Sequence, residues 1–135
     1  MVVVFLIAVQ FNIPWEITVA PLYVGTGSWS NLLLHCALAI LRDGVLVVIL
    51  YAVGYGFFRR ADWYRFPTAA TVGVMLVTGL AIAVGVERVA VVRLGRWAYT
   101  DSMPLIPGLA LGLVPILQVL VPPPLIFRFA SRWTE

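Results

Sequence analysis

The sequence predicts an all-α membrane protein whose four transmembrane helices form one bundle. Of its 135 residues, 62% are hydrophobic and only 11% are charged, with a mean hydropathy of +1.02. Such a chain has too little polar surface to cover a globule in water, which excludes a water-soluble enzyme, a secreted disulfide scaffold, a disordered tail and a nucleic-acid-binding module. Because a spanning helix needs about 20 residues, the length accommodates about four of them and no sizeable extramembrane domain. We therefore expect residues 1–135 to form a single transmembrane domain.

Turn signals divide the chain into four apolar segments. The first carries no positive charge ahead of it, so we interpret it as a retained helix rather than a signal peptide, and it ends at the Gly25–Ser28 turn. The second is followed by Arg59, and the third begins after Pro67. The fourth begins near Met103, and Pro115 predicts a kink within it. The expected helices are residues 2–23, 31–58, 68–94 and 103–127.

The distribution of arginine predicts the orientation. With four spans, both termini and the second connection share one side of the membrane. That side carries five arginines, namely Arg59, Arg60, Arg65, Arg128 and Arg132. The opposite side carries only Arg93 and Arg96. The positive-inside rule then predicts that both termini are cytoplasmic, in a multi-pass protein that we assign to the bacterial inner membrane.

Ionisable residues interrupt the apolar segments at membrane depth. Arg42 and Asp43 fall near the middle of the second segment, Glu16 in the outer half of the first and Glu87 near the outer end of the third. His35 shares a helical face with Arg42 at a spacing of seven residues. Since each charge costs roughly 2.5–3.5 kcal/mol inside a bilayer, these groups are expected to face the bundle interior and to pair.

This polar cluster has two interpretations. In the structural one, a pair such as Glu16 with Arg42 merely fixes the register of the helices. In the functional one, the acids line a cavity open to the outer leaflet, with Arg42 or Arg96 as counter-ion, and perform acid–base or proton-relay chemistry. The candidate catalytic residues are then Glu16, His35, Asp43 and Glu87.

The connection from Gly95 to Pro104 is rich in side chains that a plain connector does not need. It carries Arg96, Trp97 and Tyr99. One interpretation is a lid over the acids, with Arg96 reaching Glu87 and Tyr99 donating to a carboxylate, and the other is an interfacial loop with ordinary aromatic anchors. The candidate ligand-binding or ion-pairing residues are Arg42, Arg96, Trp97, Tyr99 and, in the fourth segment, Gln118.

Metal and nucleic-acid ligands are not expected. His35 and Cys36 are adjacent, so on a helix they diverge by about 100° and cannot easily ligate one ion together. The nine arginines are scattered at helix ends instead of forming a basic patch. No motif in the sequence names a cofactor.

The order of several short motifs resembles a group of small bacterial four-helix membrane proteins from which no activity can be transferred. The resembling residues span nearly the whole chain and are Pro14-Trp15-Glu16, Pro21-Leu22-Tyr23, His35-Cys36, Asp43, Glu87, Gly95-Arg96-Trp97-x-Tyr99, Met103-Pro104 and Gly112-Leu113-x-Pro115-x-x-Gln118. Arg42 departs from this group, in which a small residue precedes the aspartate. A fainter, compositional likeness is to the membrane carotenoid cyclases and hydratases, without a shared motif.

Three functions follow as hypotheses. The first is an accessory or structural subunit of a larger membrane assembly, which needs a stable bundle in contact with lipid and with other membrane subunits or with copies of itself. The second is a membrane-embedded enzyme or binding protein for an isoprenoid or lipid, acting through the outer-leaflet acids. The third is a small proton-coupled carrier, which would have to act as an oligomer because four helices without an inverted repeat do not form a pathway alone.

Overall fold

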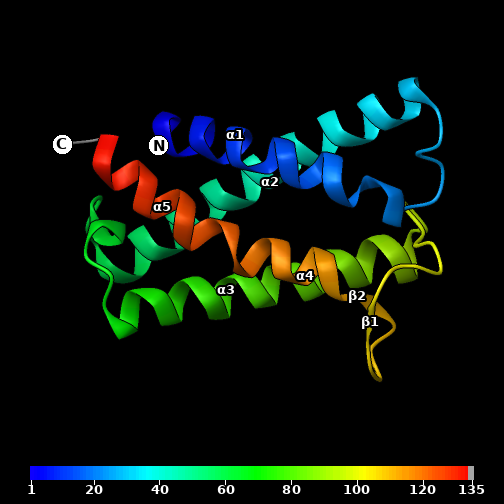
Figure 1. The fold of residues 1–135 in the computed structure, drawn as a ribbon. Helices are drawn as coiled ribbons and strands as arrows, with labels where there is room; N and C mark the ends of the chain where they lie inside the picture. Colours follow the sequence, from blue (N-terminus) through cyan, green and yellow to red (C-terminus); the bar gives the residue numbers. More distant parts are fainter. Residues whose placement is uncertain (134–135) are drawn as a thin grey trace.

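Four helical segments run side by side through the structure, a computed structural model that describes residues 1–133 (Figure 1). The segments long and apolar enough to cross a membrane are Val2–Leu22, Trp29–Phe58, Ala69–Arg93 and Leu113–Trp133. They confirm the predicted helical bundle with four spans. Both chain ends and the connection between the second and third spans lie at one end of the bundle, which we call the terminal end (Figure 1). The opposite end is called the hairpin end.

The first two spans are single helices with local stop and start signals. Helix α1 (Val2–Val19) continues as a 3-10 turn, η1 (Ala20–Leu22), and keeps Pro14 in its interior. Helix α2 (Trp29–Phe58) begins where the Ser28 side chain accepts a hydrogen bond from the backbone N–H of Asn31, 3.3 Å away. It ends at Arg59, whose φ of 55° is left-handed and stops the helix.

The third span changes its winding near the hairpin end. A 3-10 turn, η2 (Trp63–Arg65), leads into α3 (Ala69–Glu87), which starts with a capping box between Thr68 and Thr71. After Glu87 the chain continues as a π-helix, η3 (Arg88–Arg93). Such a change of winding occurs often at functional sites in helices.

The fourth span begins later than the sequence suggested. Residues expected to be helical from about 103 instead form a short antiparallel hairpin of β1 (Leu105–Ile106) and β2 (Leu111–Gly112). Pro104 and Pro107 have no N–H to donate to a helix, and Gly108 turns the chain at a φ of 80°. The span itself consists of two helices, α4 (Leu113–Leu120) and α5 (Pro122–Trp133).

Prolines explain both the break in this span and its length. Pro122, Pro123 and Pro124 cannot continue the hydrogen bonds of α4, but proline is favoured in the first turn of a new helix. Helix α5 therefore starts at Pro122 and runs to Trp133, beyond the expected end near residue 127. Pro115, where the kink was expected, lies in the first turn of α4, and the span is interrupted instead at Val121.

The buried core has two apolar parts with polar side chains between them along α1. The part at the terminal end consists of Val4, Ala8, Val47, Leu50, Trp63, Tyr64, Met75, Ile126, Phe127 and Ala130. The part at the hairpin end consists of Val19, Tyr23 and Met103. On α1, Asn12 and Glu16 lie between these two parts and are buried. The middle of the bundle is therefore polar, which positions the candidate site.

Candidate functional site

Helix α1 contributes two buried polar side chains from one face. Val4, Ala8, Asn12 and Glu16 recur every four residues and are all buried, as expected for one face of a helix. The Asn12 amide donates to the carbonyl oxygen of Ala8 at 2.8 Å, which leaves its own oxygen free to accept a hydrogen bond. Glu16 is only 1% exposed, so its carboxylate must find its partners inside the protein.

Helix α2 contributes an ion pair between neighbouring residues. The Nε and Nη2 atoms of Arg42 lie 3.0 and 2.9 Å from Oδ1 of Asp43. The same Nη2 lies 4.0 Å from Oε1 of Glu16. Asp43 is buried, whereas the Arg42 side chain keeps 31% of its surface exposed. The guanidinium thus holds Asp43 closely and Glu16 at longer range, so the expected pairing of Arg42 with Glu16 is the weaker of the two contacts.

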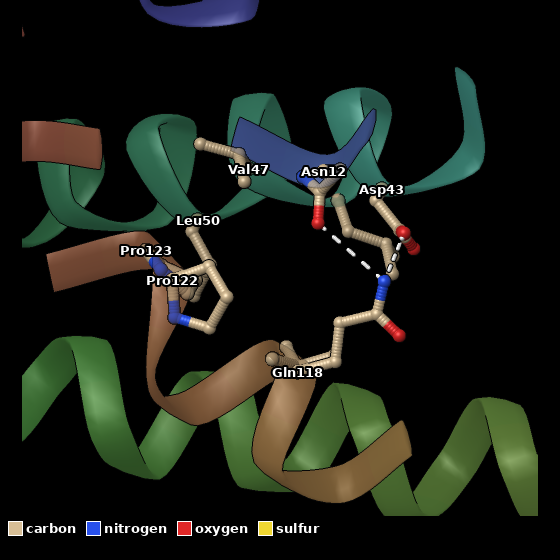
Figure 2. Close-up of a pocket in the computed structure, with 9 residues that line it drawn as sticks. Asn12, Asp43, Val47, Leu50, Gln118, Pro122 and Pro123 are labelled. Carbon is tan, nitrogen blue, oxygen red and sulfur yellow. Dashed lines mark hydrogen bonds between the residues drawn. The ribbon is translucent and has the colours of Figure 1, made fainter. Parts of the chain in front are cut away.

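Gln118 of α4 brings the two carboxylates together. Its Nε2 atom donates to Oε1 of Glu16 and to Oδ2 of Asp43, and lies 3.4 Å from Oδ1 of Asn12. Figure 2 shows Gln118 extending from α4 toward Asn12 and Asp43. Since an amide nitrogen carries two hydrogens, it can donate one hydrogen bond to each carboxylate. We call Glu16, Asp43 and Gln118 the acid-pair site.

Glu87 forms a second polar group nearer the hairpin end. Its Oε2 atom accepts a hydrogen bond from Nε1 of Trp97 at 3.3 Å and another from the hydroxyl of Tyr99. Burial, and then the hydrogen bond to Glu87, raises the pKa of the Tyr99 phenol above its ordinary value. The phenol therefore stays a proton donor. We call Glu87, Trp97 and Tyr99 the Glu87 cap.

Backbone hydrogen bonds hold the loop that carries this cap. The N–H of Val24 donates to the carbonyl of Ala98 at 2.9 Å, and the N–H of Thr100 donates to the carbonyl of Leu22 at 2.8 Å. Tyr23 and Tyr99 are thereby paired across the two segments, with ring centroids 5.9 Å apart. These hydrogen bonds hold the loop that follows the third span against the loop that follows the first span.

Arg42 links the acid-pair site to the Glu87 cap. Its guanidinium carbon lies 5.3 Å from the centroid of the Trp97 ring, a cation–π distance. A cavity of about 10 Å³ between the two groups is lined by Arg42, Asp43, Glu87 and Gln118, among others. A second cavity of about 10 Å³ lies on the Asn12 and Pro122 side of Gln118 (Figure 2). Each has room for about one water molecule.

A larger pocket reaches Arg42 from the protein surface. It has a volume of about 280 Å³, and its lining includes His35, Arg42, Arg96 and Trp97. The His35 ring also lies 5.0 Å from the ring of Tyr23. The structure therefore places His35 beside Arg42, as the helical spacing predicted, but in this outer pocket and not among the carboxylates.

The lid that the sequence suggested forms in part. Trp97 and Tyr99 contact Glu87 as described, whereas the part of the chain that the structure describes contains no ion pair between Arg96 and a carboxylate. Arg96 instead lines the outer pocket, together with His35, Arg42 and Trp97. The role of Arg96 as counter-ion to an acid therefore stays a prediction.

Two residues of the site were not among the sequence candidates. The Asn12 side-chain oxygen lies 3.4 Å from the Gln118 amide nitrogen, and Tyr23 packs between His35 and Tyr99. The four-residue spacing between Asn12 and Glu16 could have pointed to Asn12, because it puts both on one helical face. No sequence signal indicates Tyr23, whose position depends on the pairing of two loops. Among residues 1–133, no group of three or more His, Cys, Asp or Glu residues is arranged to hold a metal ion.

Comparison with known proteins gives no further guide. No protein family, curated protein or solved structure matches this chain. The structure and composition support a small polytopic membrane protein, and the kinship with small bacterial four-helix proteins stays a prediction.

Proposed function

We propose that this small integral membrane protein is a proton-binding subunit of a larger membrane assembly. The observation that carries the proposal is that two buried carboxylates, Glu16 and Asp43, converge on the single neutral amide of Gln118. Two carboxylate oxygens bonded to one nitrogen are separated by less than two hydrogen-bond lengths. The two carboxyl groups are therefore neighbours, and a proton on one of them removes the repulsion between two like charges.

The charge balance supports a bound proton. If Glu16 and Asp43 were both ionised, they would carry two negative charges against the one positive charge of Arg42. An unbalanced charge inside a membrane span is unfavourable by several kcal/mol. A single proton on the pair makes this group neutral. The neutral Gln118 amide can donate to a carboxylate and to a protonated acid alike, so it accommodates either state.

An outer pocket and a water-sized cavity, both lined by Arg42, lie on the hairpin side of the acid pair. The outer pocket with His35 leads to Arg42, and the water-sized cavity beyond it touches both Asp43 and Glu87. Toward the terminal end, the core is closed by buried side chains such as Leu50 and Phe127. A proton on the pair would exchange through the hairpin end, which is compatible with a proton-binding subunit.

The lipid-facing surface of α3 supports a partner helix. A Cβ placed at Gly73 would meet no atom within 4 Å, and Gly73 lies four residues before Val77 on the same face of α3. Small residues on such a face let a second helix approach closely. A photo-reactive side chain at Val77, on the same face and 71% exposed, should cross-link to one partner protein, whereas one at Leu38 on α2, 60% exposed, should not. Equal cross-linking from both positions would contradict a partner on α3.

The proton itself can be detected by infrared difference spectroscopy of the protein in lipid. The wild type should show the carbonyl band of a buried, protonated carboxylic acid that responds to pH. Glu16→Gln and Asp43→Asn should each remove or shift this band, while Asp101→Asn, a change at an exposed loop acid, should leave it unchanged. Absence of the band in the wild type, or its persistence in both variants, would refute the proposal.

The enzyme or binding protein for a lipophilic ligand is less well supported. The cavities in contact with Asp43 hold about 10 Å³ each, far less than the roughly 300 Å³ of a small ligand pocket. We also propose, from the arginine distribution alone, that both termini are cytoplasmic in a bacterial inner membrane.

A further inference from the structure

A pocket at the terminal end combines positive charge with an apolar floor. It has a volume of about 450 Å³ and lies between η2, α3 and α5. Arg65, Arg128 and Arg132 line it, and none of its described lining residues is a carboxylate. Arg128 and Arg132 of α5 therefore give the pocket the charge to attract an anion.

One face of α5 supplies most of its polar groups. Arg128, Ser131 and Arg132 are spaced by three and four residues, which places them side by side on the helix. Both arginines are exposed, and the Ser131 hydroxyl donates to the carbonyl oxygen of Arg128 at 2.7 Å. Two guanidinium groups one helical turn apart can bind one phosphate group together, because each presents paired N–H donors.

The floor of the pocket is apolar and continuous with the lipid-facing surface. Met75 and Phe127 are buried at its base, and Leu125 on its rim is 45% exposed. The fourth span ends at Trp133, which is 75% exposed and close to Arg132 in sequence. Exposed tryptophans at span ends mark the headgroup region of a bilayer. The pocket thus lies at the depth where phospholipid headgroups are found.

We propose that this pocket binds the phosphate-bearing headgroup of an anionic phospholipid from the leaflet next to the termini. Arg128 and Arg132 hold the phosphate, and the apolar floor of Met75 and Phe127 receives the first part of an acyl chain. Basic pockets between transmembrane helices are a known arrangement for such headgroups. This inference is independent of the acid-pair site, which involves none of these residues.

The test measures lipid binding to the delipidated protein in detergent, with native mass spectrometry as the detection method. We expect phosphatidylglycerol to bind more tightly than zwitterionic phosphatidylcholine. Arg128→Gln should weaken the binding of phosphatidylglycerol about fivefold, and Arg128→Gln with Arg132→Gln about 25-fold. Arg59→Gln removes the same charge at the same end but outside the pocket, so it should have little effect.

Two further arms separate charge from shape and lipid from free phosphate. Ser131→Phe keeps every charge but fills part of the pocket, and should also weaken lipid binding. Inorganic phosphate should compete only weakly, because it lacks the acyl chain. Equal binding of the two lipids, unchanged binding by the double arginine variant, or equally tight binding of inorganic phosphate would overturn the proposal.

Discussion

The two buried carboxylates, Glu16 and Asp43, share one hydrogen-bond donor, which is the side-chain amide of Gln118. It is 4% exposed and comes from α4, whereas Glu16 and Asp43 come from α1 and α2. A buried carboxylate that loses a hydrogen-bond donor keeps the free-energy cost of its desolvation. The amide therefore joins three helices at one atom, and its removal affects all three.

The first prediction is that Gln118→Leu destabilises the protein. The change keeps a similar side-chain volume but leaves both carboxylates without their amide donor, so the free energy of unfolding should fall by at least about 1–3 kcal/mol. Unfolding by sodium dodecyl sulfate in mixed micelles measures it. Asn31→Leu, which removes an amide at an exposed position, is the control and should change stability by less than about 0.5 kcal/mol. Equal effects of the two substitutions would show that Gln118 does not hold the acids.

The second prediction concerns the phenol of Tyr99. Because its pKa is raised in the folded protein, the folded state keeps this proton above about pH 10, where an unfolded tyrosine releases it. The unfolded state then binds fewer protons, so stability falls as the pH rises above about 10. Tyr99→Phe has no such proton, and its stability should fall less steeply with pH in this range.

At neutral pH the same variant tests the hydrogen bond itself. Loss of a hydrogen bond to the Glu87 carboxylate should lower the free energy of unfolding by about 1.5–3 kcal/mol. Tyr23, whose pKa is raised by burial first and then by Glu87, is present in both proteins, so the difference between them isolates Tyr99. Parallel stability curves above about pH 10 would contradict the assignment.

At the scale of elements, apolar runs and turn signals predicted all four spans. A segment that crosses a bilayer must be long and apolar, and a helix satisfies all of its backbone hydrogen bonds internally. The hairpin at Leu105–Gly112 was missed, because its residues are also apolar and the sequence does not show whether such residues lie in lipid or fold back as a short strand pair. Gly108 and Gly112 are four residues apart, a spacing that is also typical of a small-residue strip on a helix. They lie instead in the turn and at the end of β2.

Helix packing between α3 and α4 yields the third prediction. A Cβ at Gly79 would lie 2.9 Å from the backbone oxygen of Val119, so Gly79→Ala must push the two helices apart. We expect it to lower the free energy of unfolding by about 1–3 kcal/mol. Gly73→Ala, on the same helix, meets no atom within 4 Å and should be neutral or stabilising by up to about 1 kcal/mol. Unfolding in mixed micelles compares them, and a similar loss in both variants would argue against close packing at Gly79.

At the scale of the whole molecule, the sequence predicted that the polar groups would meet but not how. Glu16, Asp43 and Glu87 were correctly expected to face the interior, since charged groups avoid lipid. Their division into two groups depends on Gln118 and on the loop with Trp97 and Tyr99, whose positions are set by tertiary packing. Periodicity along one helix carries no information about which side chains a different helix or loop will offer.

The last prediction is the orientation of the bundle in the membrane. The five arginines that we expect at the cytoplasmic side all lie near the chain ends or in the connection between α2 and α3, which share the terminal end (Figure 1). Cells retain such positive charge on the cytoplasmic side during insertion. In a Cys36→Ala background, single cysteines at Ser28 and Ala61, both exposed, report the two ends. A membrane-impermeant maleimide added to intact cells should label the cysteine at position 28 and leave that at 61 unlabelled until the cells are permeabilised. Labelling of position 61 alone would mean that the termini lie outside, and that the arginines near them do not set the orientation.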